Sequence, residues 1–436
     1  MDNETNQILS QVGAGTPMGE LMRRYWHPIA AVAQLEDKPV MPVRLMGEDL
    51  VLYKDFSGNY GLVDRQCAHR RADLSYGFVE NVGLRCNYHG WLYDHKGEAI
   101  ERPFEETARP EFRGKVQASV RAYRAAAKAG LVWAYMGPEP APLVPNWEPF
   151  TWANGFVQIV FSEIPCNWFQ CQENSIDPVH FEWMHENWSI RQKKGADAPY
   201  GPKHLKIEFD EFDWGMVYKR IREDTDEKHP LWTIGRVCLW PHALFTGSHF
   251  EWRVPIDDHT TLSVGWFFNR VPNDCEPYVQ QRIPYWVSPI RDEKTGRWIT
   301  SHTMNQDYVA WVGQGVIADR TREHLGLSDR GIAMMRKRFL ADIDIVKAGG
   351  DPKAVVRDEK TNQCLALPMP GRKPLVDGLS REAFDRVEAR NSNSTLGATG
   401  MREFVWLVGQ PEEIKREYNE AMGWKLPVSQ GSVSQD

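Results

Sequence analysis

Residues 67–91 read CAHRRADLSYGFVENVGLRCNYHGW, and this stretch carries two pairs of metal-binding side chains. The first pair is Cys67 and His69, with one residue between them, and the second is Cys86 and His89, with two residues between them. Sixteen residues separate the two pairs, which suits two similar loops that clamp a small cluster from opposite sides. Two thiolates and two imidazoles at loop tips predict a four-ligand metal or cluster site.

Structural zinc is one candidate for this site, but zinc signatures place two or more residues inside each pair. In a Rieske [2Fe–2S] centre, two His replace two Cys on one iron. The pairs, and the Gly-Trp that follows the last ligand, resemble the Rieske pattern. In that pattern Cys67 and Cys86 would hold one iron and His69 and His89 the other. Zinc stays as the alternative, and analysis of iron and labile sulfide separates the two.

Composition narrows the class of protein. The chain has 436 residues and a net charge of −7, which gives no reason to expect nucleic acid or an anionic membrane surface as a partner. No run approaches the ~20 apolar residues of a membrane span, and the acidic start lacks the features of a signal peptide. Seven Cys, of which the cluster would use two, leave an odd number, so we expect a cytoplasmic protein without a disulfide framework.

The amino-acid sequence divides into three parts. Residues 1–26 include Thr16-Pro17, a helix start, and we expect this N-terminal helix to pack on the catalytic domain. Short alternating strands over residues 27–140 predict an all-β cluster domain. Residues 141–436 mix alternating strands with long helices, which predicts an α+β catalytic domain with an antiparallel sheet.

Individual elements of the third part can be placed. Residues 156–161 read as a strand, and residues 166–174 read as a helix that leads into a second motif. Farther along, apolar side chains at helical spacing predict a helix over residues 328–346, with Ser328 as its N-cap. We expect this long helix to be core.

The second motif is Asn174-x2-Asp177-x2-His180-x4-His185. Two His and one carboxylate with open positions beside them are typical of non-haem Fe(II) oxygenases. Five residues of regular α-helix turn the direction by about 140°, so both His can face one ion only if the helix is distorted or ends there. The alternative is an amphipathic helix whose two interior His are held by hydrogen bonds.

With both motifs present, the chain resembles the α (oxygenase) subunit of the Rieske non-haem iron aromatic-ring-hydroxylating oxygenases, within them the phthalate-dioxygenase-like group. The resemblance covers nearly the whole chain. It implies a Rieske domain inserted into a helix-grip-like catalytic domain, with His180 and His185 as ligands of a mononuclear iron. It also implies a third, distant ligand, for which Asp307 fits. The competing carboxylates are expected to be solvated or ion-paired: Asp319, Glu173 and Glu182.

The resemblance further implies how electrons travel. Nothing in the chain resembles a nicotinamide or flavin site, so NADH would act through a separate flavin/iron–sulfur reductase, with or without a ferredoxin. Asp177 would link His89 of one subunit to His180 of the next in a homotrimer or a multiple of it. Asn174, in the same motif, is a further candidate catalytic residue. Arg70 and its neighbour Arg71 offer either a docking surface or a solvated one.

The expected function is the oxygenase component that hydroxylates a carboxylated aromatic substrate with O2. One alternative is a monooxygenase or an O- or N-demethylase on the same scaffold, and another is a Rieske electron carrier, against which the long remainder of the chain argues. About half of the aromatic side chains on the strands should face a pocket. The candidates are Trp240, Phe245, His249, Trp252, Trp266 and Phe268, with Arg236 or Arg253 to pair with a carboxylate.

Overall fold

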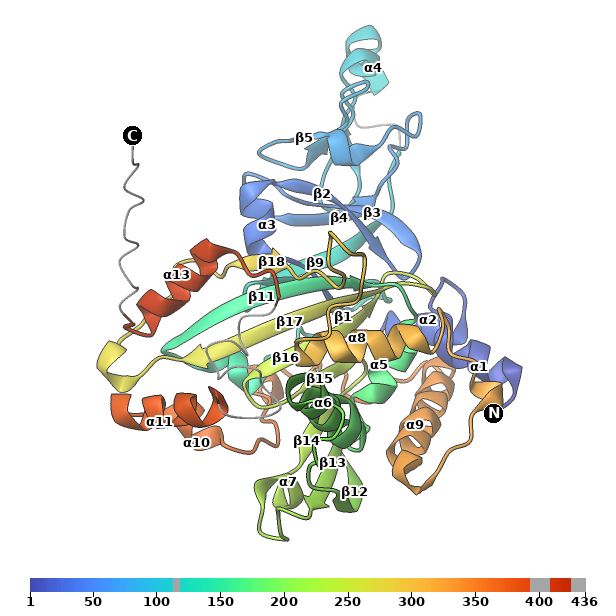
Figure 1. Ribbon diagram of the computed structural model, residues 1–436. Helices are drawn as coiled ribbons and strands as arrows, with labels where there is room; N and C mark the ends of the chain where they lie inside the picture. The colour runs from blue at the N-terminus through green and yellow to red at the C-terminus, as the bar shows by residue number, and fades with distance from the viewer. Residues whose placement is uncertain (113–117, 393–407, 425–436) are drawn as a thin grey trace.

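The computed structural model describes residues 1–112, 118–392 and 408–424, and Figure 1 shows them as two parts, one above the other. The upper part consists of short strands, and the lower part is built around one long twisted sheet. The predicted α+β architecture, in which an all-β part joins an antiparallel sheet with helices, is confirmed.

The upper part contains two antiparallel sheets. The larger has, in spatial order, β1 (Trp26–Ala31), β10 (Leu131–Tyr135), β9 (Ala122–Lys128), β4 (Tyr60–Asp64), β3 (Glu48–Lys54) and β2 (Val40–Leu45). The smaller has β5 (Phe78–Val79), β6 (Leu84–Arg85), β7 (Leu92–Tyr93) and β8 (Ala99–Glu101). Because β1 pairs with β10, the chain enters and leaves this part along one pair of neighbouring strands.

A separate core lies beneath the two predicted cluster loops. It combines apolar side chains of both sheets, such as Val51, Leu84 and Tyr93, with the buried side chains of Cys67 and Cys86. The loops are therefore held by the packed interior of the upper part, which limits how far the four predicted ligands can move apart.

The lower sheet has eight strands. They are, in spatial order, β12 (His204–Phe212), β13 (Gly215–Arg222), β14 (Arg236–Leu239), β15 (Ala243–Phe245), β16 (His249–Pro255), β17 (Thr261–Arg270), β11 (Gly155–Ile164) and β18 (Tyr285–Val287). The pairing is antiparallel except between β11 and β18. Two interior strands, β11 and β16, are almost entirely buried, which shows that both faces of this part of the sheet are covered.

Helices gather on one face of this sheet. In Figure 1, α8 (Thr303–Gly313) runs across the sheet beside α5 (Trp168–Asn174) and α6 (Trp188–Lys194), and α9 (Arg330–Lys347) lies below them. The predicted long helix is thus present but begins at Arg330 with Asp329 as its N-cap residue, because Ser328 belongs to a preceding 3₁₀ turn.

The remaining helices are all shorter than α9. They are α1 (Asn3–Ser10), α2 (Pro17–Met22), α3 (Val32–Asp37), α4 (Pro103–Ala108), α7 (Pro230–Thr233), α10 (Arg372–Asp377), α11 (Arg381–Ser392), α13 (Glu412–Ala421) and a π-helix over Phe181–Asn187. The 3₁₀ turns are Leu74–Tyr76, Pro110–Phe112, Glu148–Thr151, Asn273–Cys275, Arg320–Arg322, Leu327–Asp329 and Thr361–Gln363. Within the described ranges, no helix has both the length and the apolar character needed to span a bilayer.

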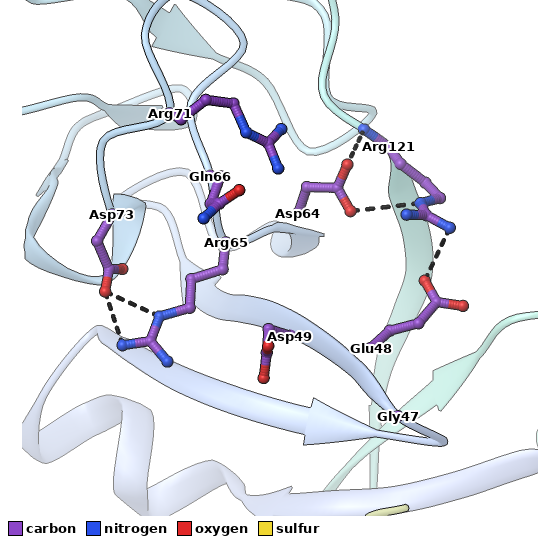
Figure 2. Close-up of a pocket in the computed structure, with 9 residues that line it drawn as sticks. All are labelled: Gly47, Glu48, Asp49, Asp64, Arg65, Gln66, Arg71, Asp73 and Arg121. Atoms are coloured by element: carbon purple, nitrogen blue, oxygen red, sulfur yellow. Dashed lines mark hydrogen bonds and ion pairs between the residues drawn. The ribbon is translucent and has the colours of Figure 1, made fainter. Parts of the chain in front are cut away.

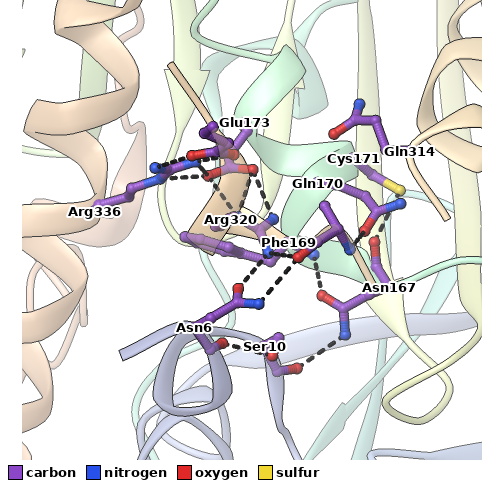
Figure 3. Close-up of polar contacts among 12 residues, drawn as sticks. Asn6, Ser10, Asn167, Phe169, Gln170, Cys171, Glu173, Gln314, Arg320 and Arg336 are labelled. Carbon is purple, nitrogen blue, oxygen red and sulfur yellow. Dashed lines mark hydrogen bonds and ion pairs between the residues drawn. The ribbon is translucent and has the colours of Figure 1, made fainter. Parts of the chain in front are cut away.

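A buried ion network attaches the N-terminal helix to the lower part (Figure 3). Arg320 is fully buried, donates to Glu173 in α5 at 2.6 Å, and donates to the Asn6 side chain of α1 at 2.9 Å. Arg336 of α9 donates to the same Glu173 carboxylate at 2.6 Å. The Glu173 carboxylate therefore joins α5 directly to α9, and joins both to α1 through Arg320, immediately before the motif residue Asn174.

Candidate metal centres

The two loops that carry the predicted cluster ligands have the same backbone conformation. In the first loop, the Cys67 N–H donates to the carbonyl oxygen five residues later, and the Arg71 N–H returns to the Cys67 oxygen at 2.9 Å. The second loop repeats both bonds around Cys86, with Gly90 donating to the Cys86 oxygen at 3.0 Å. Arg71 and Gly90 both have positive φ, at 62° and 74°. The sequence predicted two similar loops, and the structure presents the pairs from matching turns.

The loops bring the four side chains together. The rings of His69 and His89 lie edge to face with centroids 4.6 Å apart, and His69 stacks on Trp91 at 4.7 Å. Both Cys side chains are buried, and the Tyr93 hydroxyl lies 3.1 Å from the Cys67 sulfur. A hydroxyl that donates to a thiolate stabilises its charged form.

This donor set fits a Rieske cluster. The Nδ1 atom of His69 is buried and has no hydrogen-bond partner among the described residues, as expected for a nitrogen that ligates a metal. Two buried thiols and two imidazoles on opposed loops are the ligands of a [2Fe–2S] centre of this type. His89 is exposed, so one imidazole edge faces outward from the loops.

A polar pocket of about 580 Å³ lies beside the first loop (Figure 2). Arg65 pairs with Asp73 at 2.7 Å, and Arg121 pairs with Glu48 at 2.9 Å. Arg71 lines the pocket, and its side chain makes no hydrogen bond or ion pair within the part of the chain that the structure describes. The pocket is lined by both acidic and basic side chains, which makes it unsuited to an apolar aromatic ring. The unpaired guanidinium of Arg71 nevertheless lies next to the cluster loops.

The second motif folds as a π-helix, which removes the geometric difficulty of two His five residues apart. His180 immediately precedes the π-helical residues 181–187, and the Trp188 N–H donates to the Trp183 oxygen, five residues back. A backbone with i→i+5 hydrogen bonds brings residues five apart onto one face, and such turns occur at functional sites. The centroids of the His180 and His185 rings are 5.0 Å apart.

Asp307 of α8 completes a triad with these two His. Its Oδ1 atom lies 3.7 Å from His180 Nε2 and 3.3 Å from His185 Nε2. One ligand atom from each of the three residues fits within 4.8 Å of the others. Asn174 donates to the same Asp307 oxygen at 3.2 Å and so helps to orient the carboxylate. Two imidazoles and one carboxylate are a donor set that fits Fe(II).

Each imidazole of the triad has a polar partner behind it. Asp177 Oδ2 lies 3.5 Å from His180 Nδ1, and Gln306 Oε1 lies 3.0 Å from His185 Nδ1. Burial raises the pKa of Asp177, but hydrogen bonds from His180 and from the backbone outweigh it and hold that pKa below its ordinary value. Asp177 is thus a carboxylate at neutral pH.

The competing carboxylates have other partners. Glu173 belongs to the ion network of Figure 3, and Glu182 accepts hydrogen bonds from His204 at 2.6 and 2.8 Å. The exposed Asp319 accepts from Thr321. These contacts agree with the expectation that the three are ion-paired or solvated.

The chain is similar to known proteins along almost its whole length. The model of the Rieske [2Fe-2S] domain matches residues 25–123. The 5,5'-dehydrodivanillate O-demethylase oxygenase subunit of Sphingobium sp. strain SYK-6 is 59% identical over 419 residues, 96% of this chain and 96% of that protein. The phthalate 4,5-dioxygenase oxygenase subunit of Pseudomonas putida is 31% identical over 388 residues, 79% of this chain and 87% of that protein.

This chain belongs to the Rieske non-haem iron oxygenases. It is an oxygenase (α) subunit with phthalate-dioxygenase-like relatives, as its two motifs predicted. NdmB of Pseudomonas putida CBB5 has the same fold, with a TM-score of 0.54 at 19% identity over 76% of this chain and 94% of that chain. The match to the Rieske domain model favours a [2Fe–2S] cluster over structural zinc. Similarity to an oxygenase subunit over nearly the full length excludes a simple electron carrier.

Aromatic residues predicted for the substrate pocket of this Rieske oxygenase divide between the two faces of the sheet. Phe245, Trp252, Trp266 and Phe268 belong to the main core, where Trp252 packs edge to face on Trp133 of β10 at 5.3 Å. The structure therefore does not bring them to the His180 triad, because they alternate with the residues of the helix-covered face.

The other predicted pocket residues are engaged with the protein itself. Trp240 stacks on Phe339 of α9 at 4.0 Å. His249 is bonded to Glu251 at 3.0 Å, and Arg253 pairs with the same carboxylate at 2.8 Å. Among the predicted pocket residues, Arg236 contacts the π-helix over Phe181–Asn187, through the ring of Phe181.

Arg236 and Arg220 both contact Phe181, which directly follows His180 in the second motif. Each guanidinium carbon lies 4.6 Å from the centroid of the Phe181 ring, and that ring is 4.8 Å from the His185 ring. Burial, helped by the nearby Arg236 charge, lowers the pKa of Arg220 to about 10, so Arg220 is a cation at neutral pH. Neither makes an ion pair with a described residue, and the buried Nε of Arg220 has no partner among them.

Sequence reasoning missed Arg220, Phe181 and Gln306. Gln306 adjoins Asp307, and Phe181 adjoins His180, so a search of the residues next to each ligand would have found both. No local signal distinguishes Arg220 from the other cations of β13, because its place follows from the register between β13 and β14.

Proposed function

We propose that this subunit is the oxygenase component of an O-demethylase that acts on a methoxylated aromatic acid. The observation that carries the proposal is the 59% identity, over nearly the full length, to an O-demethylase oxygenase subunit that is named for a carboxylate, 5,5'-dehydrodivanillate. The two unpaired guanidiniums beside the triad support an anionic substrate. Dioxygenation, the activity in the names of two relatives at 31–33% identity, is the second candidate.

The reaction balances as follows. One atom of O2 enters a C–H bond of the methoxy group, and the resulting hemiacetal breaks into a phenol and formaldehyde. The second oxygen atom leaves as water, with two electrons from NADH and two protons. Electrons from NADH would reach the subunit through a separate flavin/iron–sulfur reductase, with or without a ferredoxin. The edge of His69 and the guanidiniums of Arg70 and Arg71 suit the contact with that donor.

The metal roles follow the donor sets. Cys67, His69, Cys86 and His89 would hold the [2Fe–2S] cluster, and His180, His185 and Asp307 would hold Fe(II). When bound, the cluster supplies single electrons, and the ferrous centre supplies open positions for dioxygen activation.

Other residues of the motif orient and connect the two centres. Asn174 would hold the Asp307 carboxylate in place, and Asp177 would connect the His180 imidazole to His89 of a neighbouring subunit in a homotrimer or a multiple of it. Residues 1–26, 27–140 and 141–436 form the N-terminal, Rieske and catalytic parts of this arrangement. The reduced thiols that it requires suit the cytoplasm.

Arg236 and Arg220 would bind the substrate carboxylate. Arg recognises carboxylates in two-pronged fashion, and hydrogen bonds to charged groups contribute about 1.5–3 kcal/mol. The repulsion between the two guanidiniums would also be relieved when an anion binds between them. The substrate would then lie against Phe181, next to the His185 imidazole.

The test is an assay with reductase, NADH and 5,5'-dehydrodivanillate as the probe, in which formaldehyde is measured against NADH consumed. Arg236→Met should raise KM for the carboxylate at least tenfold and leave the dimethyl ester of the probe unaffected, because the ester lacks the charge. Product without formaldehyde, or a cis-diol, would overturn the demethylase proposal. An equal effect on acid and ester would overturn the role of Arg236.

A further inference from the structure

We infer that Gln306 is the positioning residue for His185: its amide fixes the tautomer and the orientation of that imidazole and so sets the affinity of the second centre for its metal. The inference rests on the proposed triad of His180, His185 and Asp307. Both Gln306 and His185 are 98–99% buried, so solvent does not compete for their contact.

The contact itself joins the back of the imidazole to the amide oxygen. Gln306 Oε1 lies 3.0 Å from His185 Nδ1, and the opposite nitrogen, Nε2, faces Asp307 Oδ1 at 3.3 Å. If Nδ1 carries the proton and donates to the amide, Nε2 keeps its lone pair for a metal. Which nitrogen is protonated therefore depends on which end of the amide faces the ring.

Two further bonds decide the direction of the amide. The Gln306 nitrogen donates to the Thr300 carbonyl oxygen at 3.1 Å and to the Ser189 hydroxyl at 3.1 Å. A carbonyl oxygen can only accept, so the NH₂ end of the amide must face Thr300. The oxygen is then left for His185, and a flipped amide would place two acceptors against each other. The network thus selects one tautomer of His185 without reference to a metal.

The positions of the residues along the chain explain the arrangement. Gln306 and Asp307 are consecutive in α8, and consecutive helical residues point about 100° apart. One side chain therefore reaches the ligand face of His185 and the other reaches its back. Ser189, in α6 just after the π-helix, ties the same amide to the segment that carries His185.

The two imidazoles of the triad differ in this respect. His180 has a carboxylate behind it, Asp177, whereas His185 has a neutral amide. A neutral orienting group adds no second negative charge at a site that is almost completely buried, where an unpaired charge is costly. Groups of this kind behind a metal-bound His change metal affinity by 10–100-fold when they are removed.

The experiment measures Co(II) binding to the full-length protein, with the [2Fe–2S] absorption spectrum as the control for folding. Gln306→Leu removes the acceptor, and Gln306→Asn shortens the side chain by one methylene and withdraws the acceptor with little change in packing. Both should weaken Co(II) binding 10–100-fold and alter its absorption bands, with an unchanged cluster spectrum.

Matched controls separate the possible outcomes. Asn305→Ala alters the neighbouring buried amide of α8, whose side chain donates to the Pro289 oxygen, and should leave Co(II) affinity unchanged. Wild-type affinity in Gln306→Leu or Gln306→Asn would overturn the inference. Retention of Co(II) by His185→Ala would instead overturn the proposed triad on which the inference rests.

Discussion

Arg71 and Gly90 occupy the same place in the two cluster loops, yet only one of them is glycine. A left-handed conformation costs a residue with a Cβ roughly 1–2 kcal/mol, and glycine avoids this cost. The first loop therefore carries strain that the second does not. In exchange for this strain, the first loop places the free guanidinium of Arg71 in the pocket of Figure 2, which a glycine could not do.

We expect Gly90→Ala to destabilise the Rieske part by about 1–2 kcal/mol, since the new Cβ must adopt a φ of 74°. Arg71→Ala is the matched control, because arginine and alanine both carry a Cβ and bear the same penalty. Urea unfolding followed at the visible absorption of the cluster measures the difference. Equal effects of the two changes would contradict this account.

The candidate ligands could be selected from the sequence because the spacing of these residues is local. Cys67, His69, Cys86 and His89 form a pattern within one short stretch, and His180 and His185 form another. The choice of Asp307 rested mostly on family resemblance, since nothing in the sequence shows that α8 crosses the π-helix. Contacts such as those of Gln306 depend on three segments meeting, and a single sequence does not contain that information.

At the level of elements, the π-helix over Phe181–Asn187 is what periodicity could not predict. Regular helical spacing places His180 and His185 on different faces, and the chain resolves this by a local change in hydrogen bonding. By contrast, the strand expected over residues 156–161 and the helix expected over residues 166–174 are present as β11 and α5, with boundaries shifted by a few residues. Their apolar patterns were long enough to identify them.

The helix that leads into the second motif depends on one carboxylate. Glu173→Gln should destabilise the protein by about 3–5 kcal/mol, because it leaves the buried Arg320 and Arg336 without their shared anion. Glu412→Gln removes an exposed pair with Lys415 and should change stability by less than about 1 kcal/mol. The free energy of unfolding in urea compares the two, and a cost near that of the surface pair in Glu173→Gln would contradict the network's role.

At the level of the whole molecule, the two parts meet through core aromatic residues and one buried His pair. Alternation along β16 and β17 predicted that about half of the aromatic side chains would face away from the substrate pocket. It did not show which half. The answer depends on the Rieske part, whose Trp133 packs against Trp252. His27 of β1 lies 2.8 Å from His242, between β14 and β15, and both are buried.

This pair should make stability depend on pH. Burial lowers the pKa of His27 to about 4 and holds that of His242 well below its ordinary value of 6.5. Between pH 6.5 and 4 the unfolded chain takes up protons that the folded chain refuses. Stability is therefore present above pH 6.5 and falls on acidification, by up to about 1.4 kcal/mol per pH unit for each His.

Urea midpoints at pH 7.5, 6.5 and 5.5 measure this loss. His27→Asn should be less stable than the wild type at pH 7.5, because the bond to His242 is lost, but its midpoint should fall less steeply with pH. An identical slope in the variant would assign the acid sensitivity to other groups.

The pairing of β1 with β10 has a practical consequence. Trp26 lies opposite Tyr135, so the two crossings between the parts are only about 5 Å apart. Inserted units whose ends lie close together can be exchanged with little disturbance to their host. The Rieske part could therefore be exchanged as a unit. A Rieske domain of different reduction potential, joined at these two crossings, would change the driving force for electron transfer and leave the sequence of the catalytic part unchanged.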